Sequence, residues 1–174
     1  MSAPRDFALA PLTMRTWALL GVVVLAVAAS LLWSFHDIAA TPQRWLVPTV
    51  VVVIVLALLA SIQRRGIALR DGMLVVRASL YTRKLPVAAL RLDEARILDL
   101  DEHTQFKPLL KTNGYSIPGF HAGNFRLRNG DRAFCLLTGD GRALWLPRND
   151  DSQSLLLSPE RPQALLDALR AAQA

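Results

Sequence analysis

The chain has 174 residues, of which 52% are hydrophobic and 20% are charged, and its formal net charge is +6. This charge is spread thinly, because residues 1–65 hold five lysines and arginines against two acidic residues and residues 66–174 hold 15 against 12. A nucleic-acid-binding protein gathers its positive charge into a patch or stripe, so we expect no nucleic-acid partner. The single cysteine excludes an intramolecular disulfide and a zinc site built from several cysteines.

Two uncharged apolar runs fill the first third of the chain, over residues 17–35 and 45–62. At a rise of about 1.5 Å per residue, each run matches a hydrocarbon core about 30 Å thick. We therefore predict two transmembrane helices, over about 16–35 and 45–62. Indole rings and basic side chains often mark the boundaries of such spans, and five residues are predicted membrane anchors: Trp17, Trp33, Trp45, Arg64 and Arg65.

Basic residues flank the two runs unevenly. The short loop 36–44 contains one arginine, whereas arginines precede the first run and cluster after the second. Because positively charged flanks stay on the cytoplasmic side, residues 1–15 are predicted to be a cytoplasmic tail, the loop to be periplasmic, and residues 64–174 to be cytoplasmic. A signal peptide is the alternative for the first run, and the second span would then still leave the C-terminal part in the cytoplasm.

The part after the second run is typical of short strands separated by turn dipeptides. Asp71-Gly72 predicts a hairpin between Ile67–Arg70 and Met73–Ala78. Strands over Leu80–Val87 and Arg91–Leu100 continue the meander, although residues 88–96 also fit a helical turn.

The strongest hairpin signal is Asn129-Gly130, the preferred pair of a type I′ turn, between Phe125–Arg128 and Ala133–Thr138. Strands over Arg142–Leu146 and Leu155–Leu157 follow. Ser158-Pro159-Glu160 then predicts the start of a helix over about 159–172, with a hydroxyl cap and proline at the first helical position. Its apolar stripe must be buried against the sheet.

About seven antiparallel strands capped by one C-terminal helix is the pleckstrin-homology (PH) architecture. The glycine-marked stretch Lys111–Gly130 resembles a segment of bacterial PH-like domains, and Leu155–Pro162 is similar to the end of the same family. The resemblance covers Ile67–Leu169. It implies a mainly-β, PH-like bent antiparallel sheet or partial barrel with a C-terminal α-helix, behind a two-helix transmembrane hairpin, an arrangement for which the family is known. It implies a fold rather than a reaction.

Glycines mark the segment from Gly114 to Gly123, which we predict to be a loop at the rim of the barrel. As a partner-binding loop it would expose Tyr115, Phe120 and His121. The alternative is an irregular crossing between strands whose aromatic side chains enter the core. The candidate interaction residues are Gly114, Tyr115, Pro118, Gly119, Phe120, His121 and Gly123.

Basic side chains of the C-terminal part could form a patch that lies on anionic lipid, where each contributes about 1 kcal/mol. The alternative is ordinary surface charge. The candidate basic face consists of Arg83, Lys84, Lys107, Lys111, Arg126 and Arg128.

Asp99, Asp101 and His103 would share one face of a strand, as in a metal site, but a solvated strand end explains them better.

The sequence shows no paired nucleophile and base, paired acids or nucleotide motif. We therefore expect no enzyme activity, catalytic residue, cofactor or metal. The predicted function is a membrane-anchored interaction or scaffolding module on the cytoplasmic face of the bacterial inner membrane. Its expected partners are the lipid bilayer and a protein or a second copy of the chain. The alternative is binding or sensing of anionic lipid headgroups through the basic face.

Overall fold

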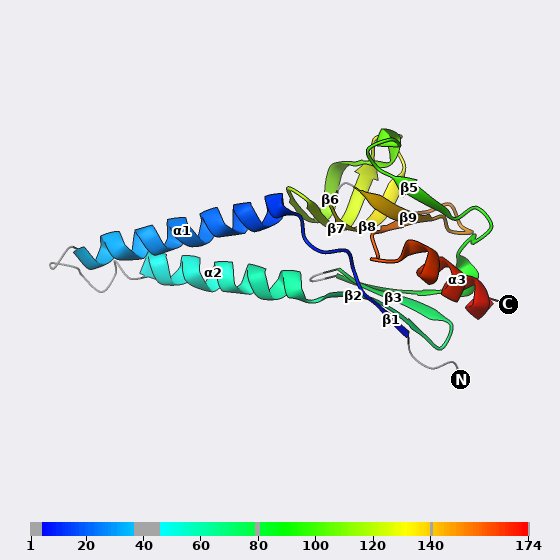
Figure 1. Ribbon diagram of the computed structural model, residues 1–174, viewed down its shortest axis with the longest axis horizontal. Coiled ribbons are helices and arrows are strands. Elements are labelled where there is room, and N and C mark those ends of the chain that lie inside the picture. The colour runs from blue at the N-terminus through cyan, green and yellow to red at the C-terminus, as the bar shows by residue number, and fades with distance from the viewer. Residues whose placement is uncertain (1–4, 37–45, 79–80, 140, 174) are drawn as a thin grey trace.

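Two helices project side by side from one end of a mainly-β domain (Figure 1). The computed structural model describes residues 5–36, 46–78, 81–139 and 141–173. The helices are α1 (Met14–His36) and α2 (Leu46–Gln63), close to the predicted spans. The predicted loop 36–44 lies outside the described residues except for its first residue, and the anchor Trp45 lies outside them as well.

One helix in the described part of the chain is long and apolar enough to cross a membrane. It covers Met14–Leu32, with a mean hydropathy of 2.0, and 6% of it is buried within the molecule. Such low burial distinguishes it from the core helix of a soluble protein. A signal sequence near an N-terminus passes the same test of length and composition, so both membrane spans stay predictions.

The first sheet is four-stranded and antiparallel, with the order β1-β2-β3-β4. Residues 1–15 were predicted to be a tail, but within them Arg5–Phe7 forms the edge strand. Residues 8–10 then run along the domain, where the Ala10 amide donates to the Ser158 carbonyl at 3.2 Å. The strands are β1 (Arg5–Phe7), β2 (Arg65–Arg70), β3 (Met73–Ala78) and β4 (Tyr81–Pro86).

The second sheet is six-stranded, with the order β5-β9-β10-β8-β7-β6, and β10 runs parallel to β8. The helix α3 (Pro162–Gln173) follows it, and short 3₁₀ turns cover Val87–Ala89 and Thr104–Phe106. The strands are β5 (Arg96–Asp99), β6 (Pro108–Ile117), β7 (Phe120–Leu127), β8 (Arg132–Thr138), β9 (Arg142–Leu146) and β10 (Ser154–Leu157).

The main core lies between the two sheets and α3. Leu74 and Val76 of β3 meet Leu136 of β8 and the buried stripe of α3, which includes Leu165 and Leu169. The opposite face of the second sheet is buried too, around Phe125, Cys135 and Leu156. A smaller apolar cluster therefore lies on the far side of this sheet.

Several local predictions were wrong. The Gly114–Gly123 segment is not a loop, because it forms the hairpin of β6 and β7. The strand predicted over Arg91–Leu100 is shorter, because only β5 (Arg96–Asp99) forms. The alternative of a helical turn within residues 88–96 holds only at its start, where the 3₁₀ turn Val87–Ala89 ends.

The turn types also differ from prediction. Asp71 and Gly72 have φ of 50° and 70°, so they form the turn with two left-handed residues that was expected at Asn129-Gly130. There only Gly130 is left-handed, with φ of 93°, and its amide donates to the Leu127 carbonyl at 3.0 Å. This is a type I turn closed by a glycine bulge, which adds one residue to the loop.

The C-terminal helix begins three residues later than predicted, at Pro162, which takes the first helical position. The expected cap, Ser158, is buried, and its hydroxyl accepts a hydrogen bond from the Thr138 amide at 2.7 Å. Ser158 therefore links β10 to β8 instead of capping the helix.

Candidate functional site

The β6–β7 hairpin holds the domain against the base of α1 (Figure 1). Thr13 precedes α1 and its hydroxyl accepts from the Thr16 amide at 3.4 Å, as a helix cap does. The Thr16 hydroxyl is buried and donates to the Pro118 carbonyl at 2.8 Å. Gly119 has φ of 77° and lies so close to Thr13 and Thr16 that a Cβ would collide with both. The hairpin tip is therefore shaped to fit this helix.

Removing the hydroxyl of Thr16 should weaken this contact. We expect Thr16→Val to lower the free energy of unfolding by about 1–2 kcal/mol, because the Pro118 carbonyl would lose a partly buried donor. Denaturation of the detergent-solubilised chain measures the change. Thr82→Val, at an exposed position of β4, is the matched control and should change stability by less than about 0.5 kcal/mol.

The predicted interaction residues are mostly used inside the molecule. Phe120 is fully buried in the main core, so it is not the exposed contact that we expected. Tyr115 is half-buried, and the His121 ring is within 3.0 Å of the Ser116 hydroxyl. The tip also lines an apolar cavity of about 110 Å³ with both helices: Leu19, Leu20, Val23, Val55, Leu59, Tyr115, Ile117 and Phe120.

Arg65 lies where α2 meets β2. Its guanidinium is 5.9 Å from the centre of the Phe120 ring, and burial lowers the pKa of this group from its usual value. Its Nη1 is buried without a hydrogen-bond partner among the described residues. Arg64 and Trp17 are exposed, and the side chain of Trp33 lies outside the described set.

The predicted basic face is not a single face. Arg83 and Lys84 are consecutive in β4 and therefore point to opposite sides. Lys107 forms an ion pair with Asp101 at 2.7 Å. Lys111 and Arg128 are exposed, on β6 and in the turn after β7.

Two of these residues, Arg83 and Arg126, lie together in a cleft of about 640 Å³ between β4, β7, the start of β8 and the loop before β10. Arg132 and Arg148, which the sequence analysis did not select, complete its charged lining. We name this site the arginine cleft and define it by Arg83, Asn124, Arg126, Arg132, Arg148 and Gln153.

Hydrogen bonds between amide and guanidinium groups hold the arginine cleft in shape. The Arg83 Nη2 donates to Asn124 Oδ1 at 3.2 Å and to Gln153 Oε1 at 3.3 Å, and the Gln153 amide donates to Asn124 Oδ1 at 2.9 Å. The guanidinium of Arg83 also lies 5.5 Å from the centre of the Phe134 ring. Three distant segments of the chain thereby fix one cation at the edge of the core.

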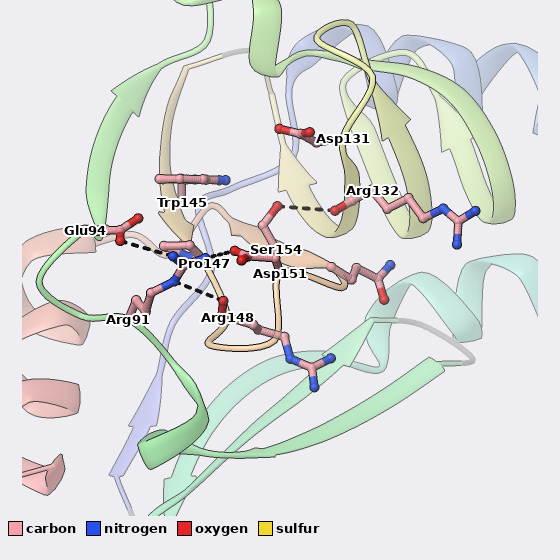
Figure 2. Close-up of a pocket in the computed structure, with 10 residues that line it drawn as sticks. Arg91, Glu94, Asp131, Arg132, Trp145, Pro147, Arg148, Asp151 and Ser154 are labelled. Atoms are coloured by element: carbon pink, nitrogen blue, oxygen red, sulfur yellow. Dashed lines mark hydrogen bonds and ion pairs between the residues drawn. The ribbon is translucent and has the colours of Figure 1, made fainter.

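A smaller pocket of about 350 Å³ adjoins the arginine cleft and shares Arg132, Arg148 and Gln153 with it. Figure 2 shows its centre, where Arg91 is joined to Glu94 and Asp151, while the side chains of Arg132 and Arg148 point away from these carboxylates. The charge of Arg91 in this smaller pocket is therefore balanced by Glu94 and Asp151.

Comparison with known proteins agrees with the fold. A family model described as a bacterial PH domain matches residues 65–173, well over half of the chain. The chain belongs to the bacterial PH domain family. Neither a curated protein nor a solved structure matches it.

Cys135 lies inside the PH domain, in the middle of β8. The side chain is fully buried, and this burial raises the pKa of its thiol well above the usual range. Because the thiolate is the reactive form, we expect no alkylation of the native chain between pH 7 and 9 and full alkylation in urea, measured by mass spectrometry. Labelling of the native chain as fast as that of a free thiol would contradict the buried position.

Asp99 and His103 do not form a metal site with Asp101 in the described part of the PH domain. The Asp99 carboxylate accepts from the Asp101 amide at 2.9 Å, and the Asp99 carbonyl accepts from the His103 amide at 2.8 Å. No group of three or more His, Cys, Asp or Glu among the described residues could hold a metal ion. These polar groups close the turn after β5.

Proposed function

We propose that the chain is a non-enzymatic binding module whose PH domain is held at the cytoplasmic face of the bacterial inner membrane by α1 and α2. The observation that carries this proposal is the direct packing of the domain on its helices, through the Thr16–Pro118 hydrogen bond and the cavity shared by both helices and the hairpin. A domain held in this way stays at the membrane surface. Its binding surfaces then meet only membrane neighbours and solutes near the bilayer.

The exposure of apolar side chains supports a membrane position for both helices. Val22 and Leu25 of α1 are 65% and 70% exposed, and Val53 and Leu56 of α2 are 59% and 60% exposed. Soluble proteins rarely expose contiguous apolar patches of this kind. Lipid would cover these faces at no cost, which favours a two-helix hairpin over a single span.

The chemistry of the arginine cleft supports binding without catalysis. Arginine stays protonated at every physiological pH, and amide side chains do not exchange protons, so this lining supplies no general base. The one cysteine is buried. Bound anions would be held there but not transformed.

An exposed pair of leucines supports a protein partner. Leu109 and Leu110 are 60% and 61% exposed on β6, the edge strand of the second sheet. Unpaired strand edges with apolar side chains are common docking surfaces. The lipid-headgroup alternative has less support, because the six predicted basic residues do not share a face.

Extraction and capture test this function. We expect the full-length chain to stay in the membrane pellet at alkaline pH and to retain a stoichiometric protein after mild crosslinking and purification. Leu109→Ser with Leu110→Ser should reduce that recovery at least fivefold, whereas Ile97→Ser, on the other edge strand, should not. Release of the wild-type chain by alkaline carbonate would refute the anchor, and equal recovery by both variants would refute the leucine surface.

A further inference from the structure

The arginine cleft carries more positive charge than nearby carboxylates balance. Four arginines line it, and none of the described lining residues is acidic. Among the described residues, one of the four has an ion pair, between Arg148 and Asp150 at 2.7 Å. Arg83 donates to neutral amides, and Arg126 donates to the Gly130 carbonyl at 3.0 Å. In the part of the chain that the structure describes, the other three positive charges of this cleft therefore have no carboxylate partner.

The adjoining pocket shows how this domain neutralises an arginine when the role is structural. Arg91 has two carboxylate partners, Glu94 and Asp151, and its Nε also donates to the Arg148 carbonyl at 3.1 Å (Figure 2). Arg132 and Arg148 have their backbones beside this acidic group but direct their side chains elsewhere. Apart from Arg148 with Asp150, the cleft arginines thus have no carboxylate partner among the described residues.

The cleft also has the size and the donors of a ligand site. Its volume of about 640 Å³ is within the range of small-molecule sites, about 300–1,000 Å³. The Nε of Arg148 is buried and has no hydrogen-bond partner among the described residues. Arg83 lines the cleft together with the hydroxyl groups of Thr112 and Ser152.

We propose that the arginine cleft binds a water-soluble anion that carries a phosphate group; this assignment rests on the binding role proposed above and names its ligand class. The planar fork of a guanidinium matches phosphate and carboxylate oxygens with two hydrogen bonds. Several uncompensated cations attract a polyvalent anion more strongly than a monocarboxylate. The chemistry of the cleft therefore selects phosphate over acetate-like ligands.

The position of the cleft selects a solute over a headgroup of the surrounding lipid. Phe120 lies beside the helices, and Arg126 follows it six residues later, about 20 Å further along β7. The headgroup layer extends only about 5–8 Å beyond the hydrocarbon core on each side. The end of the cleft formed by Arg126 and Arg132 therefore lies well away from the hairpin tip that packs on the helices, which favours a solute.

Calorimetry on the full-length chain in nanodiscs tests this proposal. The probes are pyrophosphate, inorganic phosphate and acetate, in phosphatidylcholine discs and in discs that contain phosphatidylglycerol. The variant Arg126→Gln with Arg132→Gln removes two exposed cleft cations, and Arg142→Gln with Arg161→Gln removes two exposed arginines elsewhere.

We expect pyrophosphate to bind at least tenfold more tightly than acetate, equally in both discs. The variant with Arg126→Gln and Arg132→Gln should weaken pyrophosphate binding at least tenfold. The control variant with Arg142→Gln and Arg161→Gln should weaken it less than twofold. No pyrophosphate binding, or equal loss in both variants, would overturn the site. Binding that disappears in phosphatidylglycerol discs would assign the cleft to a lipid headgroup and overturn the soluble ligand. Whether the full-length chain enters the discs tests the membrane anchoring of the proposed function, independently of whether pyrophosphate binds.

Discussion

Replacing Gly123 with alanine is expected to lower the free energy of unfolding by about 3–5 kcal/mol. Gly123 has φ of 122° and pairs with Gly114 across the hairpin, where the two strands approach closely. A Cβ at position 123 would collide with the carbonyl of Asn113 and lie 2.6 Å from the Gly114 Cα. These are backbone atoms, which cannot move aside without breaking the β6–β7 pairing.

Alkylation of Cys135 in increasing urea measures this change, because the single buried thiol reports the opening of the sheet without background. Gly66→Ala is the matched control. Gly66 is also a strand glycine, but an added Cβ there would meet nothing within 4 Å. Equal urea midpoints for Gly123→Ala and the wild type would show that the two strands do not approach so closely.

Replacing Phe120 with alanine should cost about 3–5 kcal/mol and should also loosen the domain from its helices. The side chain is fully buried and borders the existing apolar cavity between hairpin and helices, so truncation would enlarge a void instead of being filled by relaxation. Arg65 would lose the aromatic face beneath its guanidinium. We therefore expect trypsin to cleave after Arg64 and Arg65 about tenfold faster.

Phe125→Ala separates stability from anchoring. Phe125 is 2% exposed on the same strand but belongs to the smaller apolar cluster on the other face of the sheet. Phe125→Ala should lower the urea midpoint about as much as Phe120→Ala does. Trypsin cleavage after Arg64 and Arg65 should rise much less than in Phe120→Ala. Similar cleavage rates in both variants would show that the Phe120 contact does not hold the domain on the helices.

Local patterns predicted much of this fold because the relevant signals lie within a few residues. The apolar runs, the Asp71-Gly72 turn and the amphipathic stripe of α3 each depend on neighbouring residues, and the family match agrees with the domain that they indicated. β6 was missed because Gly114 interrupts its pattern and most of its side chains are exposed. β1 was missed because a three-residue strand is visible only through its pairing with β2.

The arginine cleft could be predicted only in part. Arg83 and Arg126 were selected for their charge, but nothing in the sequence indicates that Arg132 and Arg148 join them, since strand pairing and the loop before β10 bring these positions together. The glycines of the Gly114–Gly123 segment indicated a special backbone structure, but not an exposed binding loop. Its left-handed residues allow two backbones and a helix to approach, so they build the anchor contact rather than a free loop.

Cysteine labelling in intact spheroplasts tests the central claim most directly, that two spans hold the PH domain in the cytoplasm. Thr41→Cys places a thiol in the sequence between the helices, and Arg161→Cys places one at the exposed residue just before α3. The wild type is the blank, because Cys135 is buried. We predict that a membrane-impermeant maleimide labels position 41 in intact spheroplasts and position 161 only after lysis. Labelling of position 161 before lysis would contradict a cytoplasmic domain.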